Sequence, residues 1–130
     1  MRKQRGTSMI EMMAGALILI PIVLLAVDGA YVVICSKQNQ ELADAACRIA
    51  ANKQDEASAR DSALSTVARY HKTDNMDSVK VQVLEWFQTR RLVRVVTSMD
   101  VRMPVPIPGT GAPHLTAESI HAIVGIPAER

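Results

Sequence analysis

Residues 2–34 read RKQRGTSMIEMMAGALILIPIVLLAVDGAYVVI, a short basic tip followed by a long apolar run. The run from Met12 to Ile34 has 23 residues and is interrupted only by two glycines, Pro21 and Asp28. As a helix that rises about 1.5 Å per residue, it extends roughly 34 Å, which is enough to cross a hydrocarbon core of about 30 Å. We therefore expect a membrane helix at the N-terminal end, with every later segment attached to it.

The charge of the tip predicts the orientation of this helix. Residues 1–6 hold three basic residues and no acid, which favours the cytoplasmic side, so the rest of the chain is expected to be exported. A cleaved secretory signal is the alternative, because it also combines a basic tip with an apolar core. The run is longer than a signal core of about 7–15 residues, Pro21 lies in its middle, and Asp28 disturbs the cleavage pattern. These features favour an anchor that stays attached.

Glu11 is the residue of this stretch that most needs a physical explanation. A carboxylate at the centre of a membrane helix costs about 2–3 kcal/mol, and less near the edge, so it usually has a partner. One interpretation places Glu11 in the headgroup zone, facing water. The other depends on its spacing, since Glu11 is the fifth residue after Gly6 and basic residues precede that glycine.

This spacing resembles the type IV prepilin cleavage site, where a dedicated peptidase cuts after the glycine and leaves the helix attached. The resemblance implies a scissile bond between Gly6 and Thr7, with Thr7 as the new N-terminus. It also implies that Glu11 pairs with a freed amino group, in its own chain or in a neighbouring subunit. An ammonium group nearby, in a place of low dielectric constant, would favour the ionised carboxylate.

The composition of the remaining chain limits what it can be. About 95 of the 130 residues follow the apolar run, enough for one small domain. They hold 12 Lys/Arg and 11 Asp/Glu, a balance of +1, so no nucleic-acid surface is expected. On one continuous helix Cys35 and Cys47 would lie about 18 Å apart, farther than a disulfide allows. We interpret both as small packing residues, with an intersubunit bridge as the alternative.

Two helical segments are predicted after the apolar run. Residues 35–51 are expected to continue the membrane helix, because no glycine or proline separates the two. Leu42, Ala46 and Ile49 form the apolar repeat of this segment. A second helix is predicted over residues 55–71, with acids at its start and basic residues at its end. Its expected apolar stripe consists of Ala59, Ala63, Leu64, Val67 and Tyr70.

From Val79 onward the period of the sequence is two, which indicates strands. We predict strands at about residues 79–88, 92–103 and 115–124, with a proline- and glycine-rich loop at 104–113. The apolar face of the first strand is expected to hold Val79, Val81, Val83 and Phe87. Three such strands need cover on one face. The expected fold is therefore α+β, with a long N-terminal helix, a shorter second helix and a three-stranded antiparallel sheet packed on the helix.

No catalytic or cofactor chemistry is predicted from the sequence. The three histidines lack metal-ligand spacing, the two cysteines form no C-x-x-C pair, and no serine lies between nucleophile-elbow glycines. The glycines at 109 and 111 lie between prolines and begin no helix, so no phosphate site is expected. We expect a protein that is not an enzyme, without metal, cofactor or small-molecule substrate.

The chain as a whole resembles one family. The basic leader, Gly6, Glu11, the apolar helix with Pro21, the alanine-rich continuation, the valine-rich strands and the proline-rich loop are similar to the TadE-like minor pilins, or pseudopilins, of tight-adherence (Tad) pili, a type IV-like system. The specific part is the N-terminal motif, in which Met12 stands where the family usually has an aromatic residue. The resemblance implies a leader at 1–6, a pilin-like transmembrane helix at 7–34 and an exported α+β domain at 35–130.

What the resemblance implies about function is a structural role. The protein would be a subunit in the bacterial inner membrane, with its C-terminal domain in the periplasm, or in the pilus filament or tip, serving pilus assembly and surface adhesion. Its partners would be the prepilin peptidase, other pilin subunits through the N-terminal helix, and the assembly platform.

Pro21 and Asp28 are the two remaining unusual residues of the apolar run. Pro21 is expected to kink or loosen the helix locally, and Asp28 to extend into the membrane interface, with a functional ion pair as the alternative. The alternative function is an uncleaved bitopic scaffold of a pilus or secretion apparatus.

Overall fold

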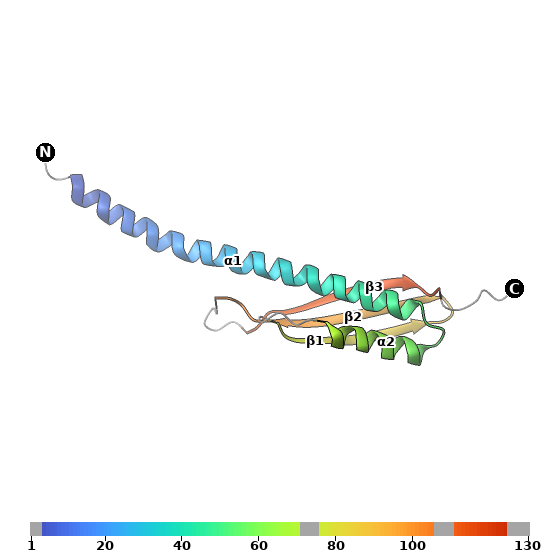
Figure 1. Ribbon diagram of the computed structural model, residues 1–130. Helices are drawn as coiled ribbons and strands as arrows, with labels where there is room; N and C mark the ends of the chain where they lie inside the picture. Colours follow the sequence, from blue (N-terminus) through green and yellow to red (C-terminus); the bar gives the residue numbers. More distant parts are fainter. Residues whose placement is uncertain (1–3, 71–75, 106–110, 125–130) are drawn as a thin grey trace.

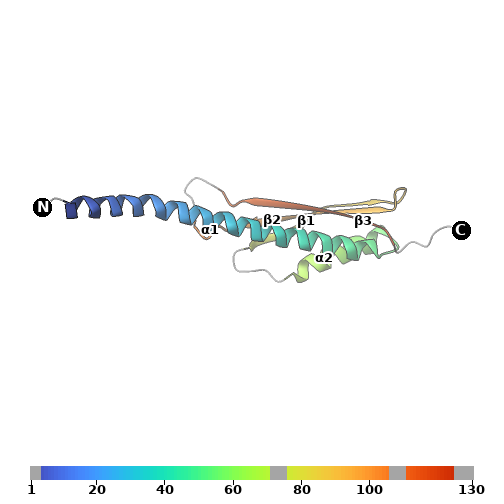
Figure 2. The same ribbon diagram turned by 90° about the horizontal axis from the view of Figure 1, so that it is seen from above.

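The computed structural model describes residues 4–70, 76–105 and 111–124. Its elements, in chain order, are α1 (Gln4–Ala51), α2 (Glu56–Arg69), β1 (Met76–Phe87), β2 (Leu92–Val101) and β3 (His114–Ala122). The sheet has the order β1-β2-β3, with antiparallel neighbours. Both helices lie on the same face of this sheet (Figure 1 and Figure 2). The predicted α+β fold, with the sheet packed on the long helix, is confirmed.

α1 is a single helix of 48 residues, about 72 Å long. The predicted continuity between the apolar run and residues 35–51 is therefore confirmed. Its N-terminal half extends beyond the domain, and its C-terminal half packs on β2 and β3 (Figure 1). Pro21 lies inside the helix and leaves the carbonyl of Leu17 without its helical donor. Figure 1 shows a gradual bow along α1 rather than a break.

Small residues form the face of α1 that contacts the sheet. The buried residues of this half are Cys35, Asn39, Leu42, Ala43, Ala46, Cys47, Ala50 and Ala51. Their spacing of three and four residues defines one side of the helix. Ile49 was predicted on this side but is 39% exposed, because the buried stripe is centred on Ala43, Ala46 and Ala50, about a quarter turn away.

α2 begins near the C-terminal end of α1 and runs back beside it in the opposite direction (Figure 1). Asp55 is its N-cap, and Oδ2 of Asp55 accepts a hydrogen bond from the Ser58 N–H at 2.8 Å. The helix ends at Arg69, and the predicted end at residue 71 lies outside the described residues. Three residues of the predicted stripe are buried, Ala59, Ala63 and Val67, whereas Leu64 is 47% exposed.

β1 differs from the prediction because it contains a β-bulge. The register with β2 shifts between Val81 and Val83, so the alternation of side chains is offset by one residue beyond this point. Leu84 and Trp86 therefore pack against the core, and Val83 and Phe87, predicted on the inner face, are exposed. β1 also begins at residue 76, three residues before its predicted start at residue 79.

β2 alternates as its sequence predicts, and its inner face is the centre of the core. Its buried residues are Val93, Val95, Thr97, Met99 and Val101. β2 ends two residues before the predicted position, and β3 is shorter than predicted, at His114–Ala122. The N–H of Val124, just after β3, donates to the Ala51 carbonyl at 2.9 Å and joins the ends of β3 and α1. Residues 1–3 of the leader, 106–110 of the predicted loop and 125–130 lie outside the described residues.

Candidate functional site

The largest apolar surface of the structure is the N-terminal half of α1. Every side chain from Ser8 to Val27 is exposed. The large apolar residues of this segment, from Met9 to Val27, are 39–77% exposed and lie on all sides of the helix. A helix that is apolar all round requires either lipid or other helices as its surroundings. α1 is long and apolar enough to span a membrane.

The predicted cleavage and assembly residues lie at the start of this segment. Gly6 and Thr7 belong to α1, which begins at Gln4, so the backbone of the predicted scissile bond is helical. The Glu11 side chain is exposed and forms no hydrogen bond or ion pair with any residue that the structure describes. Thr7 and Glu11 are four residues apart and therefore lie on the same side of the helix. The structure thus leaves the Glu11 carboxylate open to a partner.

A stripe of apolar residues lines an open groove beside Pro21. Its members are Ala16, Leu19, Ile20, Val23 and Leu24. They recur at three- and four-residue spacing, so the groove follows one side of the helix over about two turns. A surface of this shape suits an apolar side chain of a second helix or a lipid acyl chain.

Asp28 lies where the exposed half of α1 ends. Its side chain is 3% exposed, and its Oδ1 accepts a hydrogen bond from the Val105 N–H at 3.2 Å. The second carboxylate oxygen, Oδ2, is buried and has no hydrogen-bond partner among the described residues. The prediction that the Asp28 side chain extends away from the protein is wrong, because the chain after β2 covers it. Sequence reasoning identified the unusual charge but had no means of finding its partner 77 positions away.

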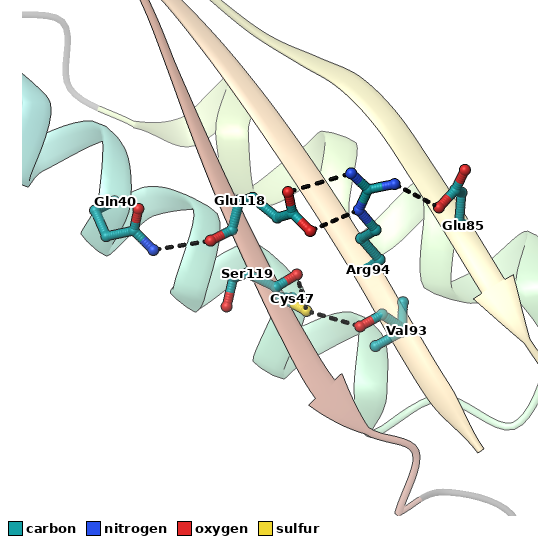
Figure 3. A network of polar contacts seen from close by, with 7 residues as sticks. All are labelled: Gln40, Cys47, Glu85, Val93, Arg94, Glu118 and Ser119. Carbon is teal, nitrogen blue, oxygen red and sulfur yellow. Dashed lines mark hydrogen bonds and ion pairs between the residues drawn. The ribbon is translucent and has the colours of Figure 1, made fainter. Parts of the chain in front are cut away.

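On the sheet face opposite the helices, Arg94 of β2 connects all three strands (Figure 3). Its Nε and Nη2 atoms bind the two carboxylate oxygens of Glu118 at 2.7 and 3.2 Å, and its Nη1 binds Glu85 at 3.0 Å. The hydrogen bonds from Arg94 lower the pKa of Glu118. All three side chains are at least one third exposed, so solvent weakens the network. We interpret it as a cross-strand structural contact.

An aspartate on α1 binds three side chains near the sheet. Oδ1 of Asp44 lies 2.6 Å from Nε2 of His121 and accepts from the Ser119 hydroxyl at 3.2 Å, and Oδ2 binds Arg48 at 2.8 Å. The hydrogen bond to His121 is the main cause that lowers the pKa of Asp44. In a Ser–His–Asp triad the histidine lies between the other two, whereas here the aspartate is the centre. This geometry therefore does not activate the serine as a nucleophile.

A second aspartate forms the same kind of cluster across the strands. Oδ1 of Asp100 lies 2.6 Å from Nδ1 of His114, and Oδ2 accepts from the Ser78 hydroxyl at 2.6 Å. The hydrogen bond to His114 is the main cause that lowers the pKa of Asp100. Again the aspartate is central, so this cluster joins β1, β2 and β3 without forming a catalytic arrangement.

Buried polar groups position the domain on α1, and sequence reasoning missed them. Asn39 is fully buried, with Oδ1 accepting from the Thr97 hydroxyl at 2.9 Å and Nδ2 donating to the Leu115 carbonyl at 3.2 Å. The thiol of Cys47 donates to the carbonyls of Val93 and Ser119 (Figure 3). Burial raises the pKa of the Cys47 thiol. Both Cys35 and Cys47 are free and buried, which confirms them as packing residues.

Neither metal sites nor relatives provide a functional assignment. Within residues 4–70, 76–105 and 111–124, no group of three or more His, Cys, Asp or Glu side chains is arranged to hold a metal ion. The chain matches no protein-family model, no curated protein and no solved structure. The features that bear on function are therefore the exposed apolar helix, the residues at its start and the domain at its end.

Proposed function

We propose that this protein is a minor pilin or pseudopilin of a Tad-type type IV pilus, a structural subunit for pilus assembly and surface adhesion. The observation that supports the proposal is the division of α1 into two unlike halves. The N-terminal half is exposed and apolar on all sides, whereas the C-terminal half packs against a folded sheet. Such a rod has two favourable surroundings, a bilayer and a bundle of similar rods, and a subunit of this kind passes from one to the other.

The position of Glu11 supports a role in assembly. In the proposed mature protein, the new amino group of Thr7 would lie one helical turn from the Glu11 carboxylate, a spacing at which opposite charges attract. A neighbouring subunit offers the same amino group in a filament. In either case an ionised pair in apolar surroundings removes the cost of leaving the carboxylate unpaired.

The proposed location follows from the basic residues that precede the apolar segment. The basic tip would remain in the cytoplasm, α1 would span the inner membrane, and the domain would lie in the periplasm until the subunit enters the pilus. The partners in this proposal are the prepilin peptidase, the assembly platform and the apolar helices of other pilins. Pro21 weakens the helical hydrogen bonding of the spanning segment, which eases its movement out of the bilayer.

The test is the N-terminus of the protein in cells with and without the prepilin peptidase. With the peptidase, intact-mass and N-terminal analysis should give a chain that begins at Thr7, and without it a chain that retains the leader. Gly6→Leu should block the processing. The matched control is Gly15→Leu on the same helix, where an added Cβ meets no atom within 4 Å beyond the local helix backbone and its chain neighbours, and this variant should be processed normally.

A second candidate function is an uncleaved bitopic scaffold of a pilus or secretion apparatus. The observation in its favour is the helical backbone at Gly6 and Thr7, because a peptidase would have to unwind the start of α1 to reach that bond. A chain that keeps its leader in peptidase-positive cells would support the scaffold and contradict the pilin proposal. Glu11→Ala sharpens the distinction, since it should abolish incorporation into filaments while leaving membrane insertion intact.

A further inference from the structure

The folded domain begins to contact α1 directly at the end of the exposed segment. From Ser8 to Val27 every side chain is exposed, and the next residue, Asp28, is almost fully buried. The atom that reaches Asp28 is the backbone nitrogen of Val105, in the chain that follows β2. No described spacer therefore separates the exposed rod from the domain.

The length of the exposed segment leaves the domain little distance from a bilayer. Ser8 to Val27 is 20 residues, or about 30 Å of helix, which equals the thickness of a hydrocarbon core. Helix tilt shortens this length along the membrane normal. Each headgroup region adds about 5–8 Å. If α1 spans a bilayer with its basic tip on one side, the contact between Asp28 and Val105 lies at the opposite headgroup region.

The topology brings one end of the sheet to this level. β2 ends and β3 begins on the side of the sheet that faces the exposed half of α1, and the hydrogen bond from Val101 N–H to the Pro113 carbonyl, 3.1 Å, closes this end (Figure 1). We call residues Met103–Val105 and Gly111–His114 the base of the domain. The β1–β2 turn at residues 88–91 lies at the opposite end (Figure 1).

The chemistry of the base differs from that of the opposite end. The described residues of the base, Met103–Val105 and Gly111–His114, contain no aspartate, glutamate, lysine or arginine. Most described residues of the base are apolar, and Pro104 and Ala112 are exposed. Its neighbouring acid, Asp100, is bound to His114 and Ser78. The opposite end, by contrast, reads QTRR at 88–91 and NKQDE at 52–56. An apolar surface without carboxylates suits the interfacial region of a membrane.

We propose that the base of the domain is a lipid-contacting surface, which rests on the headgroups of the outer face of the membrane beside the exit of α1. Tyr31, half-buried one turn beyond Asp28, lies at the level where aromatic side chains favour the interface. The Asp28–Val105 hydrogen bond holds the base against the helix, so the domain is oriented by the bilayer as well as by α1. This inference rests on the proposed function only through the membrane-spanning state of α1.

The test measures lipid proximity with the full chain in vesicles that contain an anionic lipid. A fluorophore is attached to Ala112→Cys at the base, to Thr89→Cys at the opposite end, or to Ala16→Cys in the exposed helix. The unlabelled native cysteines are buried, and the wild-type chain gives the background. Nitroxide lipids labelled at the headgroup should quench the label at 112 about twofold or more strongly than the label at 89, because only the base lies within the headgroup layer.

The label at Ala16 separates the failure of this inference from the failure of its premise. Quenching at 16 by a nitroxide deep in the acyl chains, without quenching at 112, would show a spanning helix with a domain away from the lipid and would overturn the inference alone. No quenching at 16 would overturn the spanning helix and the inference together. Energy transfer between labels at 112 without lipid quenching would assign the base to contact with a second copy, and would also overturn it.

Two substitutions at Asp28 test the connection between helix and base. Asp28→Ala removes the acceptor of the Val105 N–H and should reduce lipid quenching at 112 while leaving quenching at 16 unchanged. Asp28→Asn keeps an oxygen at this place and should retain the quenching. Asp61→Ala, an exposed acid on α2, is the matched control and should have no effect. Equal quenching at 112 in all of these proteins would contradict the role of Asp28.

Discussion

Between Ser8 and Val27, α1 exposes large apolar side chains on every side, whereas between Cys35 and Ala51 it buries a stripe of mostly small residues beneath β2 and β3. One continuous helix thus holds two regions with different requirements. In the first region large apolar side chains are present at all positions around the helix axis, so no single side is distinguished. In the second region the position around the axis determines which residues are buried, because small residues permit close approach of the sheet only on one side. The same type of substitution should therefore have a large effect in one half and little effect in the other.

The largest expected effect is a charge placed in the exposed half. Ile18→Arg puts a guanidinium near the middle of the segment, at a cost of about 2.5–3.5 kcal/mol for membrane insertion. The fraction of protein that resists alkaline extraction from membranes should fall strongly. Ile49→Arg is the matched control, because Ile49 is 39% exposed and lies outside both the membrane segment and the buried stripe. Equal loss of membrane association in the two variants would contradict the division of α1.

A smaller effect, in the opposite half, is expected from added volume. Ala46 is fully buried against the sheet, so Ala46→Leu should destabilise the domain by about 1–3 kcal/mol through overpacking. Alanine and leucine have similar helix propensities, so the change reports packing. Ala16→Leu, in the exposed half, should leave the free energy of unfolding unchanged. Urea denaturation in detergent, followed by the fluorescence of Trp86, measures both, and an unaffected Ala46→Leu variant would argue against the buried stripe.

The smallest expected effect concerns acid pH. Hydrogen bonds to His121 and His114 lower the folded-state pKa values of Asp44 and Asp100. A lowered folded-state pKa stabilises the domain above the unfolded value of about 4, and this stabilisation is lost as the pH falls through the folded-state value. The urea midpoint should therefore decline below about pH 4.

Asp44→Asn tests this decline in the sheet-bound half of α1. The variant should show a shallower loss of stability between about pH 5 and pH 2 than the wild-type chain, while Asp61→Asn, with its side chain exposed on α2, should follow the wild type. Parallel curves for all three proteins would exclude a contribution of the Asp44–His121 contact to acid sensitivity.

Sequence reasoning succeeded where a pattern is local. The continuation of α1 beyond the apolar run follows from the absence of glycine and proline in residues 30–51, and the inner face of β2 follows from strict alternation. It failed at the second half of β1, because the bulge after Val81 depends on pairing with β2 and leaves no mark in the alternation itself. The misplacement of Ile49 has a related cause, since two alternative stripes on α1 have similar composition and only the sheet selects between them.

The residues of the candidate site also fall into a group that the sequence reveals and a group that only the fold reveals. The basic tip, Gly6, Glu11 and the apolar run are adjacent in the chain and are recognised without any coordinates. The partners of Asp28 and Asp44 are not, because Val105 and His121 each lie 77 positions away and reach them only through the return of the sheet along α1.

The amino-acid sequence alone determined that this chain has a long apolar helix at its start and a small α+β domain after it, because helix length and strand period are properties of neighbouring residues. Only the tertiary structure decided where the apolar rod ends and the domain begins. That boundary is set at Asp28, where a backbone N–H from the distant β2–β3 connection reaches a buried carboxylate. Such a contact depends on how the sheet packs on α1, which no local pattern encodes.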